Sequence, residues 1–233
     1  HGLALDTRTV AVQLERGARS GIGVAAFEHG GFVVDGGSRA MDLDDGAGVP
    51  PLIARMAFPS RWRVLLVRDG ARLGVHGDRE RSAFETLERY SDDEAAYLCR
   101  LVMMRLLPGL AEHDLKSFGD AVSEVQRRVG DHFAPAQGGR YASADVAGVL
   151  QWLANNGAAG IGQSSWGPTG FALCETESEA RRLSRAAAKA AGGAQTIQIS
   201  IHAARNTPGT IGSSDVPRET PQHERTAEAM HSP

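Results

Sequence analysis

The segment Gly160–Gly170, which reads GIGQSSWGPTG, carries the strongest chemical signal in this chain of 233 residues. Gln163, Ser164 and Ser165 offer neutral hydrogen-bond donors, and Trp166 offers a flat face for an aromatic ligand. The surrounding glycines allow backbone amides to approach a ligand closely. A hairpin turn requires glycine and proline but no amide, hydroxyl or indole. We therefore predict a substrate-binding loop, with a purely structural loop as the alternative.

A second glycine-rich segment, residues 17–23, leads into an apolar run. Ser20 can cap a helix that follows it, and the N-terminal amides of such a helix attract phosphate. Arg19 adds a fork of donors, so we predict a polyanion site at Arg19, Ser20 and Gly21. Two alternatives stay open. The first is a dinucleotide-binding turn, whose glycine spacing this segment formally matches, although no strand leads directly into the first glycine. The second is that the glycines serve close packing alone.

His76 and Glu80 are spaced as two metal ligands one helical turn apart would be. No further cluster of histidine or cysteine completes such a site, so the spacing does not by itself predict a metal centre. The simpler interpretation of Glu80 is a negative charge near the beginning of a helix. The acidic run at Asp42–Gly46 resembles the start of a calcium loop but lacks the closing glutamate, and we reject it.

The elements that position these segments are amphipathic helices and short apolar strands. Capping signals at Ser91 and Asp114 predict long helices after them, the first of which ends at Pro108-Gly109. Asp145 is expected to begin another helix, and a segment starting at Asp6 fits a helix or a strand. Hairpin-like strand pairs around packed helices indicate an α+β fold. The expected strands cover 32–34, 62–67, 158–162, 171–174 and 196–201, and the expected helices 79–88, 91–107, 114–129, 145–153 and 177–191.

Composition excludes several classes of protein. The chain has 25 Lys and Arg against 28 Asp and Glu, a net charge of −3, which argues against a nucleic-acid partner. No apolar stretch is long enough to span a membrane, and no secretory signature is present, so we expect no membrane partner. Cys99 and Cys174 lie in apolar runs and are expected to be buried and reduced, as in a cytoplasmic protein. Residues 205–233, rich in proline, are expected to form a disordered tail.

Three segments taken together resemble the beta-ribofuranosylaminobenzene 5'-phosphate synthase family of the GHMP kinase superfamily. The similarity extends over about residues 1–206, and the run QSSWGPT is its most specific part. The segments are 16–23 with Phe27 and 30–37; 62–67 with Gly74, Gly77, Glu80 and Phe84; and 162–169.

This resemblance implies a GHMP-kinase-like fold with two domains. Residues 1–55 would be the C-terminal part of the N-terminal domain, 60–204 a ferredoxin-like C-terminal domain, and 205–233 the tail. Members of the family carry a phosphate loop rich in glycine and serine upstream, which this sequence lacks. The resemblance therefore implies an N-terminally truncated fragment that is inactive in isolation.

The implied reaction transfers a phosphoribosyl group from phosphoribosyl pyrophosphate to 4-aminobenzoate or a related aromatic acid, with loss of carbon dioxide, in tetrahydromethanopterin biosynthesis. Magnesium would accompany the pyrophosphate. The resemblance assigns phosphate binding to Arg19, Ser20 and Gly21, and the aromatic acid or the ribose to the loop from Gln163 to Trp166. Glu80 is the candidate catalytic residue, for stabilising positive charge on the ribose carbon.

Two other functions stay open. Sugar and mevalonate kinases of the superfamily often read Ser-Gly-x-Asp where this chain reads Ser20-Gly21-Ile22-Gly23, so a carboxylate near the accepting hydroxyl is missing. A GHMP-type small-molecule kinase using ATP is therefore the alternative. The third option is a remnant that binds ligands or dimerises without catalysis. The expected partners are small-molecule substrates, and the sequence leaves open whether the protein is a homodimer.

Overall fold

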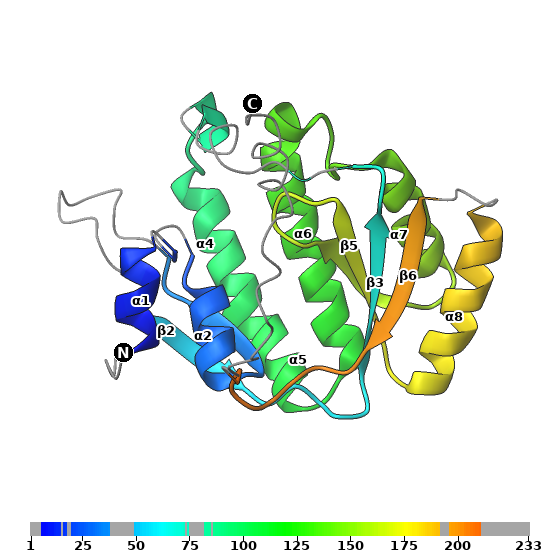
Figure 1. Cartoon of the computed structure of the whole chain (residues 1–233), viewed down its shortest axis with the longest axis horizontal. Helices are drawn as coiled ribbons and strands as arrows, with labels where there is room; N and C mark the ends of the chain where they lie inside the picture. Colours follow the sequence, from blue (N-terminus) through cyan, green and yellow to red (C-terminus); the bar gives the residue numbers. More distant parts are fainter. Residues whose placement is uncertain are drawn as a thin grey trace, which may run out of the picture.

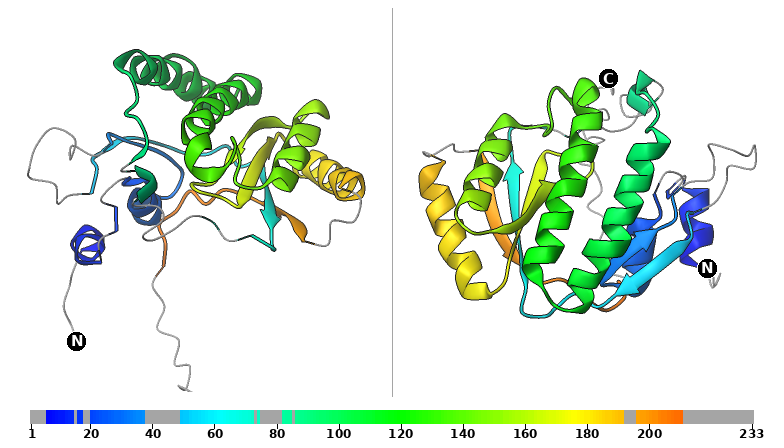
Figure 2. Two further views of the ribbon diagram at one scale, coloured as in Figure 1. Left: turned by 90° about the horizontal axis from the view of Figure 1, so that it is seen from above. Right: turned by 180° about the vertical axis from the view of Figure 1, so that it is seen from behind.

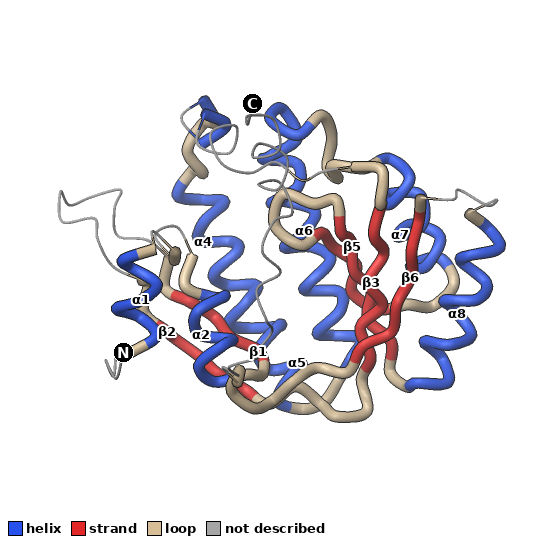
Figure 3. Tube along the Cα trace, in the orientation of Figure 1, coloured by secondary structure: helices blue, strands red, loops and turns tan. Residues whose placement is uncertain are grey.

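The computed structural model describes residues 6–14, 16–17, 20–37, 49–72, 74, 82–84, 86–191 and 196–210. In Figure 1 a small N-terminal part lies on the left, and a larger sheet with helices packed on it lies on the right. Helices from the middle of the chain lie between them. The described strands form two separate sheets, one with two strands and one with four (Figure 3).

The N-terminal part consists of α1 (Thr7–Gln13), α2 (Ile22–His29) and the antiparallel pair β1 (Phe32–Asp35) and β2 (Leu52–Met56). The carboxylate of Asp6 accepts a hydrogen bond of 2.9 Å from the amide of Thr9. This cap satisfies a backbone donor at the start of α1, so the segment that fitted a helix or a strand is a helix. Strand β2 was absent from the sequence-based expectation.

The larger sheet has the strand order expected of a ferredoxin-like domain. It contains β3 (Arg63–Asp69), β4 (Ala159–Gln163), β5 (Thr169–Cys174) and β6 (Ile197–His202) in the order β4-β5-β3-β6. All three neighbouring pairs are antiparallel, and Leu65 lies opposite Ala172 on β5 and Ile201 on β6. Helices connect β3 to β4 and β5 to β6, which gives the β-α-β-β-α-β pattern. The predicted α+β fold is confirmed.

The helical run that follows β3 in the described chain begins after Ser91, whose hydroxyl accepts a hydrogen bond from the amide of Glu94 as expected. It consists of α4 (Asp92–Leu101), a π-helical turn η2 (Val102–Leu106) and α5 (Leu107–Ala111). The predicted end at Pro108-Gly109 is wrong. Pro108 falls in the first turn of α5, where the missing N–H of proline is tolerated, and the helix runs on to Ala111.

The remaining helices are α6 (Leu115–Gln137), α7 (Ala144–Asn155) and α8 (Glu177–Ala190). Asp114 caps α6 as predicted, but Ser143 rather than Asp145 caps α7, because its hydroxyl accepts from the amide of Val146. Helix α6 is longer than expected and ends at Gly138, in the left-handed conformation. Figure 2 (left) shows α7 and α8 on one face of the larger sheet, while α6 packs against its edge strand β4.

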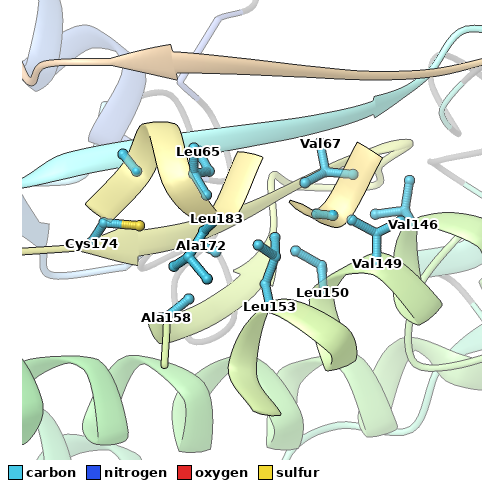
Figure 4. Close-up of a cluster of buried hydrophobic side chains, with 12 residues drawn as sticks. Leu65, Val67, Val146, Val149, Leu150, Leu153, Ala158, Ala172, Cys174 and Leu183 are labelled. Carbon is cyan, nitrogen blue, oxygen red and sulfur yellow. The ribbon is translucent and has the colours of Figure 1, made fainter. Parts of the chain in front are cut away.

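Two apolar cores hold these layers. The first lies between the larger sheet and the helices α7 and α8, and Figure 4 shows Leu65 and Val67 of β3 facing Leu150 and Leu153 of α7. Cys174 belongs to it, and burial raises the pKa of its thiol to about 12. Cys99 on α4 is exposed, so the expectation that both cysteines are buried is wrong for this one. None of the described helices has the length and apolarity to span a bilayer.

The second core joins the N-terminal part to the rest of the chain through four aromatic rings. Phe118 of α6 lies 5.4 Å from the ring of Phe32 on β1 and 5.4 Å from that of Trp62. Phe58 packs edge-on against Trp62 at 5.4 Å. Such contacts stabilise a core beyond the burial of their area. The two parts therefore share one interior, although the sequence divides them into separate domains.

Residues 205–209 return to the N-terminal part. The side-chain amide of Asn206 accepts from the amide of Phe58 and donates to its carbonyl, both at 2.8 Å. Arg55 donates to the carbonyl of Asn206, and the amide of Gly31 donates to that of Arg205. These contacts show that the expected disordered tail cannot begin at residue 205. Residues 211–233 lie outside the described part.

Helix α6 meets β4 at a pair of glycines. A Cβ atom on Gly119 would lie 2.7 Å from the backbone nitrogen of Gly160 and 2.8 Å from Cβ of Ala159. Gly160 has a φ of 56°, which a residue with a side chain rarely adopts. The backbones of α6 and β4 can therefore approach this closely only because both positions are glycine.

We predict that Gly119→Ala lowers the free energy of unfolding by about 1–3 kcal/mol, because the added methyl group meets rigid backbone. Denaturant unfolding measures the change. The control is Gly148→Ala, since a Cβ on Gly148 in α7 meets nothing within 4 Å. This variant is expected to gain about 0.5–1 kcal/mol from helix propensity. Equal stability of the two variants would contradict the tight contact.

Candidate functional site

A cavity of about 320 Å³ lies where the C-terminal half of α6 meets the loop after β4. This volume is at the lower end of the range for small-molecule sites. Its lining includes Ser20 from the N-terminal part and Phe84 from the segment before α4. The lining residues are Ser20, Phe84, Gln126, Val129, Gly130, Phe133, Gln137, Arg140, Tyr141, Gln163, Ser165 and Trp166.

Three aromatic rings form one wall of the cavity. Trp166 is only 7% exposed, and its ring centroid lies 4.7 Å from that of Phe133 and 5.5 Å from that of Phe84. The two phenyl rings also meet each other edge-on at 5.7 Å. Trp166 is thus held by protein contacts and still borders the cavity. A wall of this kind suits a flat, apolar ligand surface.

Gln163 ties the loop to two other segments. Its side-chain oxygen accepts from the amide of Ala142 at 2.7 Å. Its side-chain nitrogen donates to Gln137 Oε1 at 3.0 Å and to the carbonyl of Ser165 at 2.9 Å. Both N–H donors of the amide are therefore engaged by the protein. In this arrangement Gln163 positions the loop.

The two serines of the loop differ in location. Ser165 lines the cavity and holds a left-handed backbone, with a φ of 51°. Ser164 is exposed and is not among the lining residues; its amide donates to the carbonyl of Thr169 at 2.8 Å. The turn closes at Gly167, where a Cβ atom would lie 2.8 Å from that of Ala142. Glycine is therefore required for the loop to pack on the segment before α7.

A carboxylate occupies the beginning of α2. Asp35 Oδ2 accepts from the amide of Gly21 at 2.6 Å and from the hydroxyl of Ser20 at 3.0 Å. Its other oxygen accepts from the amide of Gly37 at 3.2 Å. The donors that we predicted for phosphate are thus already bound to the carboxylate of Asp35. Phosphate binding there stays a prediction, and it requires a phosphate to share or displace Asp35.

Among the described residues that line the cavity, Arg140 is the charged one. Its guanidinium donates to both oxygens of Asp131, from Nε at 2.7 Å and from Nη2 at 3.1 Å, which raises the pKa of Arg140. The neighbouring Tyr141 also lines the cavity, and burial raises the pKa of its hydroxyl. The described part of the lining therefore combines one fixed cation with neutral polar groups and an aromatic wall.

Of the eight predicted site residues, four line this cavity: Ser20, Gln163, Ser165 and Trp166. Gly21 and Ser164 lie beside it, within the same two segments. Arg19 and Glu80 lie outside the described residues.

Sequence reasoning missed the contribution of α6 to the site. The helix contributes Gln126, Val129, Gly130, Phe133 and Gln137, at positions i, i+3, i+4, i+7 and i+11, which lie on one helix face. This periodicity is visible in the sequence and was the available signal. Arg140 and Tyr141 follow directly after the end of α6 and had no such pattern.

The described residues do not fit a magnesium ion held by the protein. No group of three or more histidine, cysteine, aspartate or glutamate side chains gathers within the described ranges. The described lining of the cavity contains no carboxylate, which is the ligand that magnesium prefers.

The family model described as "GHMP kinases C terminal" matches residues 106–193. Over these residues the chain is similar to the C-terminal domain of GHMP kinases. Two solved structures share its fold. A homoserine kinase from Cytophaga hutchinsonii aligns with a TM-score of 0.51 and 18% identity, covering 80% of this chain and 51% of the kinase. A putative homoserine kinase from Listeria monocytogenes has a TM-score of 0.51 and 14% identity, covering 88% and 60%. These two likenesses concern the fold alone.

Curated relatives carry the name beta-ribofuranosylphenol 5'-phosphate synthase. The protein from Methanothermobacter thermautotrophicus is 30% identical over 182 residues, which is 75% of this chain and 54% of the relative. The protein from Archaeoglobus fulgidus is 35% identical over 192 residues, 79% of this chain and 57% of the relative. The chain thus spans about half the length of these relatives. The resemblance drawn from the motifs is confirmed, with a phenol in the relatives' name where we expected an aminobenzene.

Gln163→Leu is predicted to lower the free energy of unfolding by roughly 2–4 kcal/mol, because three side-chain hydrogen bonds are lost together. Hydrogen exchange at the amide of Ala142, which donates to Gln163, should accelerate. Ser164→Ala is the control, since its hydroxyl forms no hydrogen bond in the described part of the chain and a change within about 0.5 kcal/mol is expected. Unaltered exchange at Ala142 in Gln163→Leu would contradict the positioning role.

Proposed function

We propose that the protein to which this chain belongs transfers a phosphoribosyl group from phosphoribosyl pyrophosphate to an aromatic acid, with loss of carbon dioxide. The product, an aryl riboside 5'-phosphate, would enter tetrahydromethanopterin biosynthesis. The observation that carries the proposal is the cavity, in which Ser20, the Gln163–Trp166 loop and three aromatic rings meet one arginine. Homologues named as synthases of a ribofuranosylphenol 5'-phosphate support it.

The reaction requires positioning more than it requires a protein nucleophile. The bond between ribose C1 and the pyrophosphate breaks, and the pyrophosphate leaves with the electron pair. The ring carbon that bears the carboxylate attacks C1, and a carbon–carbon bond forms. The bond to the carboxylate then breaks, its electrons restore the aromatic ring, and carbon dioxide departs. No proton, oxidant or reductant is consumed.

The residues of the cavity fit this sequence of events. An aromatic wall can hold the ring of the acid against the ribose carbon, and holding two reactants in place is a large part of catalysis in such a reaction. With the acid against this wall, the packed rings of Phe84, Phe133 and Trp166 would also limit water around its carboxylate. A poorly hydrated carboxylate loses carbon dioxide more readily than a solvated one, because the charge that it gives up is less stabilised.

The name of the relatives bears on the acceptor. A ribofuranosylphenol carries a hydroxyl on the ring, so the acid that yields it by this reaction is 4-hydroxybenzoate, whereas 4-aminobenzoate yields an aminobenzene. We propose 4-hydroxybenzoate as the preferred acceptor. Magnesium belongs to the proposal as a partner of the pyrophosphate, because the described lining supplies no carboxylate to hold it.

We predict that the product of the complete coding sequence releases carbon dioxide from carboxyl-labelled 4-hydroxybenzoate only when phosphoribosyl pyrophosphate and magnesium are present. Release from labelled 4-aminobenzoate is expected to be slower. Mass spectrometry of the riboside product checks the carbon–carbon bond. Release without the pyrophosphate donor would contradict the proposal, and turnover of ATP with a hydroxylated acceptor instead would favour the kinase alternative.

Trp166→Leu is expected to raise the KM for the aromatic acid about fivefold and that for the ribosyl donor less than twofold, because a face-on aromatic contact is lost. Trp152→Leu is the matched control. Trp152 lies on α7 and packs at the edge of the other core, away from this cavity, so neither KM should change. Steady-state kinetics with each substrate varied in turn decides between these outcomes. An equal rise of both KM values in Trp166→Leu would show that the aromatic acid does not bind against this wall.

A further inference from the structure

We propose that Arg140 binds the phosphate groups of the ribosyl donor, an assignment that deepens the proposed function and rests on it. Arg140 is the charged residue among the described residues that line the cavity. The other polar residues there, Ser20, Gln126, Gln137, Tyr141, Gln163 and Ser165, are neutral. A ligand with several negative charges therefore has one cationic partner in the described lining.

The guanidinium is held in place before any ligand binds. Asp131 accepts from Nε and Nη2, as described above, and the backbone carbonyl of Arg140 accepts from Gln137 Nε2 at 2.9 Å. The side chain passes directly over α6 at Gly130, where a Cβ atom would lie 2.7 Å from Cγ of Arg140. An arginine fixed in this way loses little side-chain entropy when it binds an anion.

Part of the guanidinium is left for a ligand. Within the described part of the chain Nη1 of Arg140 forms no hydrogen bond. Asp131 is also shared, since Arg127 Nη1 lies 3.3 Å from its Oδ2. Arg127 is held more closely by Glu124, at 2.8 Å, so what Arg140 offers a ligand is its unengaged Nη1 donor rather than a surplus of charge. A guanidinium with a free Nη1 group can donate to a phosphate oxygen while it keeps its pair with Asp131.

The other candidate for phosphate is less suited to the task. The amide of Gly21 and the hydroxyl of Ser20 both donate to Asp35, so a phosphate at the start of α2 would meet a carboxylate. Repulsion between like charges opposes that arrangement. The described residues thus place a carboxylate at the start of α2 and an unengaged guanidinium donor at Arg140.

Arg140 also suits the phosphate better than it suits the carboxylate of the aromatic acid. That carboxylate must give up its charge as carbon dioxide leaves. An ion pair with Arg140 would stabilise the starting acid and would weaken as the reaction proceeds, which slows it. A phosphate keeps its charge throughout and gains from the pair at every stage.

The test compares Arg140→Gln with the matched control Arg127→Gln. Both residues pair with Asp131 and are about equally exposed, at 45% and 43%, but Arg140 alone of the two lines the cavity. Calorimetry on the product of the complete coding sequence measures the binding of phosphoribosyl pyrophosphate and, separately, of 4-hydroxybenzoate. We expect Arg140→Gln to weaken donor binding at least tenfold and acid binding less than twofold. Arg127→Gln should change neither by more than twofold.

Retained binding of 4-hydroxybenzoate shows that Arg140→Gln is folded, and Arg140→Lys, which keeps the charge without the fork, should lie between the parent and Arg140→Gln. Unchanged donor affinity in Arg140→Gln, a larger loss for the acid than for the donor, or no donor binding by the parent would overturn the assignment. Product formation by the parent is scored separately. If the parent protein binds the donor through Arg140 but forms no product, only the proposed reaction is contradicted. If Arg140→Gln forms product with an unchanged KM for the donor, only the assignment of Arg140 is contradicted.

Discussion

The close contact between α6 and β4, where Gly119 meets the backbone of Gly160, is the constraint on which the cavity depends. It fixes the position of α6, and α6 carries five of the lining residues on the face that follows Gly119 by two to five turns. The same strand leads directly into the loop that begins at Gln163. A shift of the helix along the strand would therefore separate Phe133 from Trp166. It would also break the hydrogen bond of 2.8 Å that the backbone amide of Gln163 donates to Gln126 Oε1.

A second constraint brings the N-terminal part to the cavity. Phe118 stands beside Gly119 on α6 and packs against Phe32 of β1 and against Trp62. Strand β1 ends at Asp35, which holds Ser20 and Gly21. One helix turn thus connects both sides of the site, since it touches β4 through a glycine and β1 through an aromatic ring. The return of Asn206 to Phe58 closes the same junction from the end of the chain.

The sequence predicted elements whose signals are local. Short apolar runs, of which only 196–201 alternates, located the strands of the larger sheet, and capping residues located the beginnings of α4 and α6. The failures involve long-range packing. Pro108 predicts the end of a helix, although it lies in the first turn of α5, directly after a π-helical turn. The exposure of Cys99 depends on which face of α4 packs on α6, and no local pattern gives that.

The candidate site divides in the same way. The run from Gln163 to Trp166 could be found because its residue types are unusual for a hairpin, but residue type does not say which partner a polar group takes. The amide of Gln163 is engaged by Ala142, Gln137 and Ser165, and the donors of Ser20 and Gly21 are engaged by Asp35. Groups that look available in the sequence therefore build the cavity. Within the described lining, the charged donor that remains for a ligand belongs to Arg140, whose position only the packing of α6 reveals.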